Sequence, residues 1–509
     1  MKKLILKFLK FFGFLILLVA LFVFVLAILP LPETLQQKKE SEKFILTNVN
    51  IIDVQNDSIK ANQSIVVENN RITRITSRDS ILNDSNYKII DGNNKYAMPG
   101  LWDMHSHLAL QVAPQTVMPL HIANGITNIR DMQGVVRINK ERKLWREQIK
   151  SGELLGPRII GFADEIVGDN YDERDVTKVV NRSVKEQGTF IKIYSNILSE
   201  RYFKLAKEAK KQGVDFAGHY PNSINPVEAS NAGQRSFEHA HLFIDYSHTA
   251  ANQQREYYRA LSLEESPDKK LKVSSAEKLA NFDYDKFYEL VDVMVKNNTY
   301  FCPTHITKQY EASVNNDAFL NDEKIKYIPP IIYNIWKDDI NGMKDYEQKL
   351  LTDFYKKGLE LTGMAHKRGV KILAGTDSYD PYSFPGFSLH RELEELVKAG
   401  LSPAEALATA TINPSEYFSV SNDYGTLEKG KVADIILLNK NPLINIKNSA
   451  SIETIIFNGS LYNRVELNEF LNYVEQNVSG IKGMSITVKI FFRLMKDNRP
   501  SVRNSEKEE

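Results

Sequence analysis

Cysteine is almost absent from this chain, and so is any excess of charge of one sign. The single cysteine, Cys302, excludes an intrachain disulfide and a cysteine-rich zinc site. A metal would therefore have to be held by His, Asp, Glu or a modified Lys. The 65 basic and 64 acidic residues leave a formal charge of +1, without a basic stripe of interleaved aromatic residues. This balance lacks the electrostatic footprint of nucleic-acid binding, and we expect no nucleic-acid partner.

Compositional bias is also missing. Hydrophobic residues make up 42% and charged residues 25% of the chain, which excludes a largely disordered protein. The 509 residues exceed what one small core needs, so we expect two or more structural units.

One long hydrophobic run stands apart from this ordinary composition. The run from Phe11 to Leu29 is followed by Pro30 and Pro32 and preceded by four lysines. A run of about 20 apolar residues can cross a bilayer as a helix, whereas a cleaved signal peptide usually has a shorter one. We predict an uncleaved, single-pass anchor in residues 1–32, with its helix at about 11–30; a cleaved signal is the alternative. The lysines predict that the N-terminal end lies inside and the large domain on the extracytoplasmic side of the cell membrane.

Strand-like segments lie near both ends of the remaining chain. Residues 44–53, 64–68 and 71–75 are rich in β-branched side chains, with Asn69-Asn70 as a plausible hairpin turn. Similar segments recur only at 433–438 and 452–459. We therefore predict one small β-sandwich domain built from 44–98 and 423–465.

Alternating strand-like and helix-like segments fill residues 99–422. Candidate strands start near eight positions: Leu101, Gly125, Arg158, Thr189, Val214, Arg235, Thr299 and Val370. Helical periodicity is clearest in four segments: Ile138–Lys150, Glu200–Lys211, Tyr284–Lys296 and Leu389–Lys398. Eight such units indicate a (β/α)8 TIM barrel, whose active site lies at the carboxyl ends of its strands. An open doubly wound sheet is the alternative, weakened because no G-x-G-x-x-G follows the first strand.

Three further segments do not belong to the repeating pattern. Residues 243–297 and 309–350 are longer than a plain barrel needs, and such insertions are usually lids or binding loops. Residues 466–509 are predicted to form a C-terminal helix and a polar tail. Within them, Ile481–Met495 mixes basic and apolar residues, which is typical of a packed terminal helix or of one lying on a membrane surface.

Titratable residues collect where the predicted strands end. The first strand ends in His105 and His107, whose i, i+2 spacing points both rings to one side. Strands five, six and eight end in His219, His239 and Asp377. Alone, each could be an ordinary polar residue or a helix cap. Together, this many titratable groups at one barrel end would be costly to bury unless a metal compensates them.

A lysine, Lys192, lies in the middle of the apolar fourth strand, Phe190–Tyr194. It could be an edge-strand charge or a snorkelling side chain.

With these residues, the chain from Phe44 to about Tyr462 resembles the binuclear amidohydrolase superfamily of metal-dependent hydrolases. Two segments carry the general likeness: Met98–His107, at the entry into the barrel, and Gly425–Asp434, at the return to the β domain. Four short motifs are similar to the branch of imidazolonepropionase-like enzymes and Xaa-Pro dipeptidases. These motifs are Ile191–Tyr194, Glu238–Ala240, Cys302–Thr304 and Ala399–Leu407.

The resemblance implies two divalent metal ions, with Zn²⁺ expected, and a role for each strand-end residue. His105 and His107 would hold one ion with Asp377. Lys192, carboxylated by CO2, would bridge to a second ion held by His219 and His239. Asp377 would act as general acid and base for a metal-bridging hydroxide that attacks a C–N bond.

Further residues are candidates for substrate binding. Tyr194 lies two residues beyond Lys192, and His305 follows the seventh strand; either could instead pack in the core. Arg130, at the end of the second strand, could receive a substrate carboxylate or pair with Asp131.

His390, after the eighth strand, could meet substrate or lie on an outer helix face. His241 shares its direction with His239, and the family pattern favours His239 as the ligand. After the third strand, Gly161–Gly168 lacks the histidine that many of that branch carry, so substrates cannot be transferred from relatives.

The sequence therefore predicts a hydrolase of an amide, dipeptide or cyclic amide, with a small-molecule or short-peptide substrate. A mononuclear deaminase is the first alternative, although such relatives typically lack the strand-four lysine. A catalytically inactive, membrane-anchored binding module is the second. Homo-oligomerisation is left open.

Overall fold

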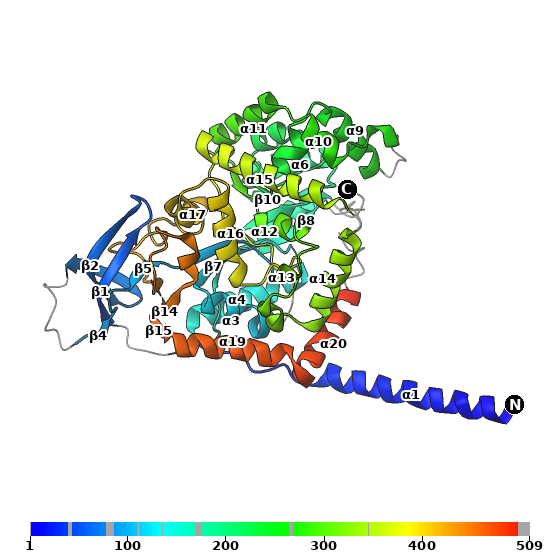
Figure 1. Cartoon of the computed structure of the whole chain (residues 1–509), viewed down its shortest axis with the longest axis horizontal. Helices are drawn as coiled ribbons and strands as arrows, with labels where there is room; N and C mark the ends of the chain where they lie inside the picture. The colour runs from blue at the N-terminus through cyan, green and yellow to red at the C-terminus, as the bar shows by residue number, and fades with distance from the viewer. Residues whose placement is uncertain are drawn as a thin grey trace.

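A computed structural model describes residues 2–38, 43–77, 86–108, 112–134, 136–168, 175–186, 188–263, 268–344 and 346–496. The predicted polar tail beyond residue 496 and part of the linker before residue 43 lie outside these ranges. A sheet, a helix-covered barrel and a projecting N-terminal helix follow one another across the view in Figure 1.

The separate sheet contains eight strands from both ends of the chain, in the order β15-β14-β13-β5-β1-β2-β3, with β4 beside β1. Hydrogen bonding links all eight into one sheet, where the sequence predicted a sandwich. Apolar residues of strands from both ends share one buried cluster. The strands are β1 (Lys43–Asp53), β2 (Ser58–Glu68), β3 (Arg71–Ser77), β4 (Lys88–Asp91), β5 (Tyr96–Pro99), β13 (Ile435–Leu438), β14 (Ile452–Phe457) and β15 (Ser460–Asn463).

Two local features make this sheet possible. Asn69 and Asn70, between β2 and β3, have φ values of 50° and 59°, a left-handed conformation that asparagine tolerates in tight turns. Strand β13 pairs antiparallel with β5, from Ile435 opposite Pro99 to Leu438 opposite Tyr96. Because β5 leads directly into the barrel, this pairing ties the returning chain to the first barrel strand.

The barrel contains seven parallel strands in chain order. Each begins within one residue of a start predicted from the sequence. The strands are β6 (Leu101–Ser106), β7 (Ile126–Asp131), β8 (Arg158–Val167), β9 (Phe190–Ile193), β10 (Asp215–Gly218), β11 (Ser236–Glu238) and β12 (Tyr300–Cys302).

The eighth predicted strand, near Val370, does not form as a regular strand. Its segment makes isolated parallel bridges from Ile372 to Phe301 and from Ser378 to Ser106. Backbone hydrogen bonds from Met104 N to Ala374 O and from Asp377 N to His105 O connect it to β6. Asp377 has a φ of 52°, which is incompatible with continuous extended pairing. The segment therefore closes the gap between β12 and β6 without a full ladder.

Helices cover the outside of the barrel. The four helices predicted from periodicity correspond to α4 (Asn139–Ser151), α6 (Ser199–Gln212), α11 (Tyr284–Asn297) and α16 (Phe387–Lys398). Asp283 caps α11 by accepting from two backbone N–H groups, and Ser402 forms a capping box at α17. The helices up to β11 are α2 (Ala113–Thr116), α3 (Met118–Ala123), α4 (Asn139–Ser151), α5 (Val176–Glu186), α6 (Ser199–Gln212) and α7 (Pro226–Asn231). Those after the last barrel strand and its insertion are α16 (Phe387–Lys398), α17 (Pro403–Thr409) and α18 (Ile412–Tyr417).

Both long insertions are helical. The first contains α8 (Leu242–Tyr246), α9 (Ala251–Ser262), α10 (Ser275–Ala280) and α11 (Tyr284–Asn297). The second, with its flanks, contains α12 (His305–Glu311), α13 (Asp317–Leu320), α14 (Pro330–Met343) and α15 (Gln348–Arg368). Trp336 of α14 is buried in a separate apolar cluster with Tyr382 and Phe384, which follow Asp377. The second insertion therefore packs on the segment that carries a candidate ligand.

The described part of the chain begins and ends in helices that meet each other. Helix α1 (Lys2–Ile28) projects from the body, while α19 (Arg464–Val478) and α20 (Gly480–Lys496) run along it (Figure 1). Within α1, residues Lys7–Ile28 are long and apolar enough to cross a membrane.

Candidate metal centre

The residues that end the barrel strands converge on Asp377. Its Oδ1 lies 2.6 Å from Nε2 of His107 and 3.3 Å from Nε2 of His105. Its Oδ2 lies 3.5 Å from Nδ1 of His239. Suitable ligand atoms of His105, His239 and Asp377 all lie within 4.8 Å of one another. The ends of two strands, β6 and β11, and the closing segment thus bring four predicted ligands together.

His219 joins this group through His239. The two Nε2 atoms lie 2.9 Å apart, and the rings are perpendicular with centroids separated by 4.5 Å. Gly218, just before His219, has a φ of 141°, and a Cβ there would meet the carbonyl oxygen of Ile193 at 2.3 Å. Only glycine therefore lets β10 approach β9 this closely.

Lys192 is 1% exposed and points into the same region, with its Nζ 5.9 Å from the centre of the Tyr194 ring. Burial lowers the pKa of this amine to about 8, although Glu238 and Asp377 oppose the shift. The lowered pKa increases the fraction of uncharged amine near neutral pH. Only the uncharged amine is nucleophilic and can react with CO2.

Each candidate imidazole is also held by a contact at its Nδ1 atom. His105 Nδ1 donates to Oε2 of Glu238 at 2.9 Å, and His107 Nδ1 donates to Oε1 of Gln133 at 2.7 Å. His219 Nδ1 lies 2.8 Å from Oγ of Ser195, and His239 Nδ1 lies 3.1 Å from Oγ1 of Thr304. Such partners fix the tautomer and the ring direction of metal-binding histidines.

These contacts leave lone pairs facing one another. With Nδ1 of His105 and of His107 donating away, a neutral ring at either position directs an Nε2 lone pair at the Asp377 carboxylate. The two Nε2 atoms of His219 and His239 also face each other, and at most one proton can lie between them. A bound cation would accept these nitrogen and carboxylate lone pairs, so the donor set fits a divalent metal such as zinc.

The protonation states suit the same purpose. Burial holds the pKa of His105, His219 and His239 well below the usual value, and nearby cationic groups add to the shift. Burial alone would raise the pKa of Asp377, but His105 and His107 outweigh it and lower the value. Neutral imidazoles and an ionised carboxylate are the forms that bind metal.

Among the predicted substrate contacts, only Tyr194 lies at this centre. Its ring stacks on His219 at 4.4 Å between centroids and 24° between planes. The alternative ligand His241 lies parallel to His239 at 5.7 Å and approaches Asp245, with its Nε2 4.0 Å from that carboxylate.

Arg130 is placed differently from either predicted role. It is fully buried and donates to both carboxylate oxygens of Glu238 at 2.9 Å and to Ser236 Oγ at 2.9 Å. Asp131 pairs instead with Arg142. The Arg130 guanidinium supports the ligand frame from inside the barrel and does not face a substrate.

His305 and His390 point away from the cluster. His305 Nε2 contacts Thr362 on α15 at 2.9 Å, because the chain turns into α12 at this residue. His390 Nε2 donates to the carbonyl of Asn124 at 3.0 Å, and its Nδ1 accepts from Ser449. Both ring nitrogens of His390 thus hold the barrel against neighbouring segments, and neither is available to substrate.

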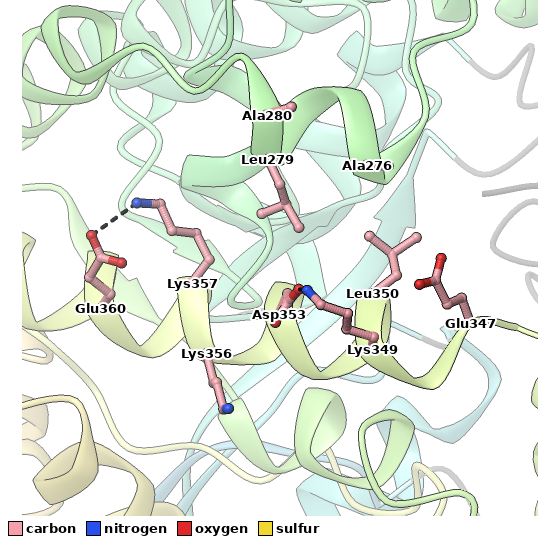
Figure 2. A pocket seen from close by; sticks show the side chains of 10 residues that line it. All are labelled: Ala276, Leu279, Ala280, Glu347, Lys349, Leu350, Asp353, Lys356, Lys357 and Glu360. Atoms are coloured by element: carbon pink, nitrogen blue, oxygen red, sulfur yellow. Dashed lines mark hydrogen bonds and ion pairs between the residues drawn. The ribbon is translucent and has the colours of Figure 1, made fainter.

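A surface pocket of about 540 Å³ lies between α10 and α15, and none of the candidate ligands lines it (Figure 2). Four of its charged side chains form two local pairs, Lys357 with Glu360 and Lys349 with Asp353. The chemistry of the chain therefore belongs to the histidine cluster.

A family model described as "Amidohydrolase family" matches residues 96–462. The chain belongs to this family. Membership supports a metal-dependent enzyme that hydrolyses C–N bonds, as the family generally uses divalent metals. It agrees with the donor set assembled around Asp377.

Several curated proteins are similar to this amidohydrolase. A 5'-deoxyadenosine deaminase of Methanosphaera stadtmanae is 22% identical over 80% of this chain and 91% of its own length. Two matches are short. A 5-methylthioadenosine/S-adenosylhomocysteine deaminase of Carboxydothermus hydrogenoformans is 28% identical over 24% of this chain and 29% of its own. An imidazolonepropionase of Symbiobacterium thermophilum is 37% identical over 14% of this chain and 16% of its own.

Solved structures share the fold. A Xaa-Pro dipeptidase with bound methionine superimposes with a TM-score of 0.59 and 19% identity, covering 83% of this amidohydrolase and all of that chain. A bottromycin amidohydrolase superimposes with a TM-score of 0.64 and 17% identity, covering 87% and 92%. The likeness to the dipeptidase branch expected from short motifs is therefore present in the fold.

Proposed function

We propose that the chain is a binuclear hydrolase that cleaves an amide bond of a dipeptide, short peptide or cyclic amide. The observation that carries this proposal is the buried amine of Lys192 beside the histidines and Asp377. Attack of its neutral amine on CO2, with loss of one proton, forms an anionic carbamate. This change replaces a cation that would repel metal by a two-oxygen ligand able to bridge two ions.

In this proposal His105, His107 and Asp377 hold one ion, and His219 and His239 hold the second. Zn²⁺ suits a site of imidazole and carboxylate ligands. When bound, the ions would supply Lewis acidity that lowers the pKa of water and polarises a carbonyl group.

Asp377 would move the proton in this reaction. Its low pKa keeps the carboxylate ionised and able to accept a proton at Oδ1 or Oδ2. The same group would then deliver that proton to the leaving nitrogen, which must be protonated to depart as an amine. Tyr194, stacked on His219, would contact the substrate at the rim.

A deaminase is the second candidate, because the match to 5'-deoxyadenosine deaminase extends over 80% of this chain. It also cleaves a C–N bond, but at a purine ring. The mononuclear form of this chemistry would need only one set of ligands and leaves Lys192 without a role.

Metal content tests the binuclear proposal. We would purify the full chain in detergent from cells grown with zinc and bicarbonate, beside Lys192→Ala and the matched control Lys211→Ala, an exposed lysine on α6. About two metals per chain in the parent and control, and one or none in Lys192→Ala, is the expected result. Equal content in all three would contradict the bridging role, and a metal-free, folded parent would favour an inactive binding module.

A paired substrate screen then separates amide hydrolysis from deamination. Dipeptides and cyclic amides are assayed by release of amine, and adenine nucleosides by the change in ultraviolet absorbance. Turnover of the first group alone supports the proposal. Turnover of nucleosides alone assigns the deaminase instead.

We further propose that α1 anchors this hydrolase as a single-pass helix, with the barrel on the extracytoplasmic side. Only 6% of its apolar window is buried against the rest of the described chain. Exposing so much apolar surface to water is unfavourable, whereas a bilayer would cover it. Protease protection of the barrel in sealed spheroplasts and vesicles of known orientation tests the sidedness.

A further inference from the structure

Helix α20 presents an apolar stripe that the rest of the described chain leaves about half exposed. Ile481, Met484, Phe491 and Phe492 are 62%, 41%, 47% and 45% exposed. Met484, Phe491 and Phe492 follow Ile481 by 3, 10 and 11 residues. At about 3.6 residues per turn, this spacing places all four on one side of the helix. Scattered exposed apolar residues are normal, but a continuous stripe marks an interaction surface.

The opposite face of α20 is fixed to the body. Ile486 and Ile490 are buried in a cluster with Val112, against which Ile331 and Tyr379 also pack. The helix is therefore held in place by one apolar face, and the exposed stripe is a second face.

Helix α20 is also joined to the end of α1. Ser485 Oγ donates to the carbonyl oxygen of Leu26 at 2.8 Å, and Lys489 Nζ donates to those of Ala27 and Leu29 at 2.6 and 2.7 Å. Carbonyl groups in the last turn of a helix lack partners within it, and a cation there is favourable. These bonds fix α20 where α1 leaves the body, and the two helices run in different directions from that point (Figure 1).

The exposed stripe continues the apolar surface of α1. A pocket of about 530 Å³ between the two helices is lined only by apolar residues, namely Leu15, Ile16, Val19, Ala20, Val23, Phe24 and Ala27 of α1 and Phe492 of α20. Phe492 thus faces the segment of α1 that is apolar enough to cross a membrane. Whatever medium surrounds α1 also contacts this face of α20.

We propose that α20 is an interfacial helix whose apolar stripe inserts into the lipid bilayer beside α1. The proposal rests on the membrane anchoring of α1 proposed above. A bilayer is favoured over a second copy of the chain because the stripe and α1 form one continuous apolar surface. Helix α20 has no acidic residue and four basic ones, which suits the headgroup region of an anionic membrane.

The placement has a consequence for the metal centre. The buried face of α20 packs on Tyr379 and Val112, and these residues follow Asp377 and His107 by two and five positions. Helix α20 would therefore lie between the bilayer and the segments that follow these two candidate ligands.

Fluorescence at single introduced cysteines tests this surface in the full chain. Cys302 is buried, so the parent protein serves as the labelling blank. An environment-sensitive fluorophore is placed at Met484→Cys, at Phe492→Cys, at Phe14→Cys within α1, and at Leu144→Cys. Leu144 is a matched control, because it is an apolar residue of α4 that is 55% exposed. The variants are reconstituted in vesicles of phosphatidylcholine and phosphatidylglycerol, with or without bromine on the acyl chains.

We expect the labels at positions 14, 484 and 492 to shift to shorter wavelength and to lose fluorescence with brominated lipid, while the label at 144 does neither. If position 14 is quenched but 484 and 492 behave like 144, the proposal for α20 is wrong and the anchor stands. A shift to shorter wavelength at positions 484 and 492 that depends on the density of protein in the vesicles, without quenching by brominated lipid, would assign the face to a second copy. An unquenched position 14 would overturn the anchor, and the proposal for α20 with it.

Discussion

Glu238 accepts a hydrogen bond from Nδ1 of His105 at 2.9 Å inside the barrel. The same carboxylate receives both hydrogen bonds of the Arg130 NH2 group. The Glu238 carboxylate therefore lies between the Arg130 guanidinium and the His105 ring in a fully buried position. This link orients His105 so that Nε2 faces Asp377.

We predict that Glu238→Gln weakens metal binding at the His105 side by about 10–100-fold, the usual effect of losing such a partner. Glutamine keeps the shape but leaves Arg130 without its counter-charge, so the melting temperature should fall as well. Metal titration with a competing chelator measures the affinity.

The control for this variant is Asp434→Asn, which breaks the buried ion pair with Arg158 at the sheet domain and contacts no candidate ligand. It should lose stability and keep its metal affinity. Equal metal affinity in both variants would show that Glu238 has only a structural role.

Tyr194 offers a second test, because its ring and its hydroxyl can be separated. Tyr194→Phe keeps the stacking on His219 and should retain metal, while kcat/KM falls by about tenfold if the hydroxyl contacts substrate. Tyr194→Ala removes the stacking and should also lower metal content. An unchanged kcat/KM in Tyr194→Phe would limit the residue to packing.

The starts of seven barrel strands could be predicted because each follows a polar or glycine-containing turn and is locally apolar. The Asn69-Asn70 hairpin was predictable for a similar reason, since its conformation depends on the two residues themselves. The segment after Val370 has the same local pattern, but the positive φ of Asp377 interrupts it. That distortion is set by the packing of distant elements and leaves no local signal.

The site was predictable to the extent that its residues end strands. The i, i+2 pair His105 and His107 and the lysine in an apolar strand are signals in the sequence. The partners Gln133, Ser195 and Thr304 are not, because they meet their histidines only after folding and carry common residue types. Glu238 had one usable signal, since a charged residue directly before His239 in a buried strand needs a partner. His390 was wrongly predicted to contact substrate, because the direction of its side chain depends on the rotation of α16 about its axis, which the sequence does not show.

If Asp377 transfers the proton, its substitution should lower kcat by more than the loss of a metal ligand alone would. Asp377→Asn should lower kcat by about 10²–10⁴-fold, the usual contribution of a general acid or base. Asp380→Asn, three residues away and outside the cluster, is the matched control and should keep its activity. Metal content is measured in parallel, and a metal-loaded Asp377→Asn that retains kcat would remove the residue from catalysis.

His390 predicts how stability depends on pH in the metal-free protein. Burial lowers the pKa of His390 to about 4, while its bond to Asn124 opposes the shift. The unfolded chain takes up a proton near the ordinary value of about 6.5, whereas the folded chain does not until about pH 4. The folded state therefore loses up to about 1.4 kcal/mol per pH unit through this residue as the pH falls from 6.5 towards 4. Above pH 6.5 the contribution is constant.

The variant His390→Gln removes this titration while keeping a donor for the Asn124 carbonyl. It should be less stable than the parent at pH 7, because the packing against Ser449 is lost, and the difference should shrink as the pH falls to 5. Urea midpoints of the metal-free full chain in detergent at pH 7, 6 and 5 measure this difference. The control is His366→Gln, at a half-buried histidine that pairs with Glu405. A difference that stays constant with pH would mean that the folded protein binds a proton at His390 as readily as the unfolded chain does.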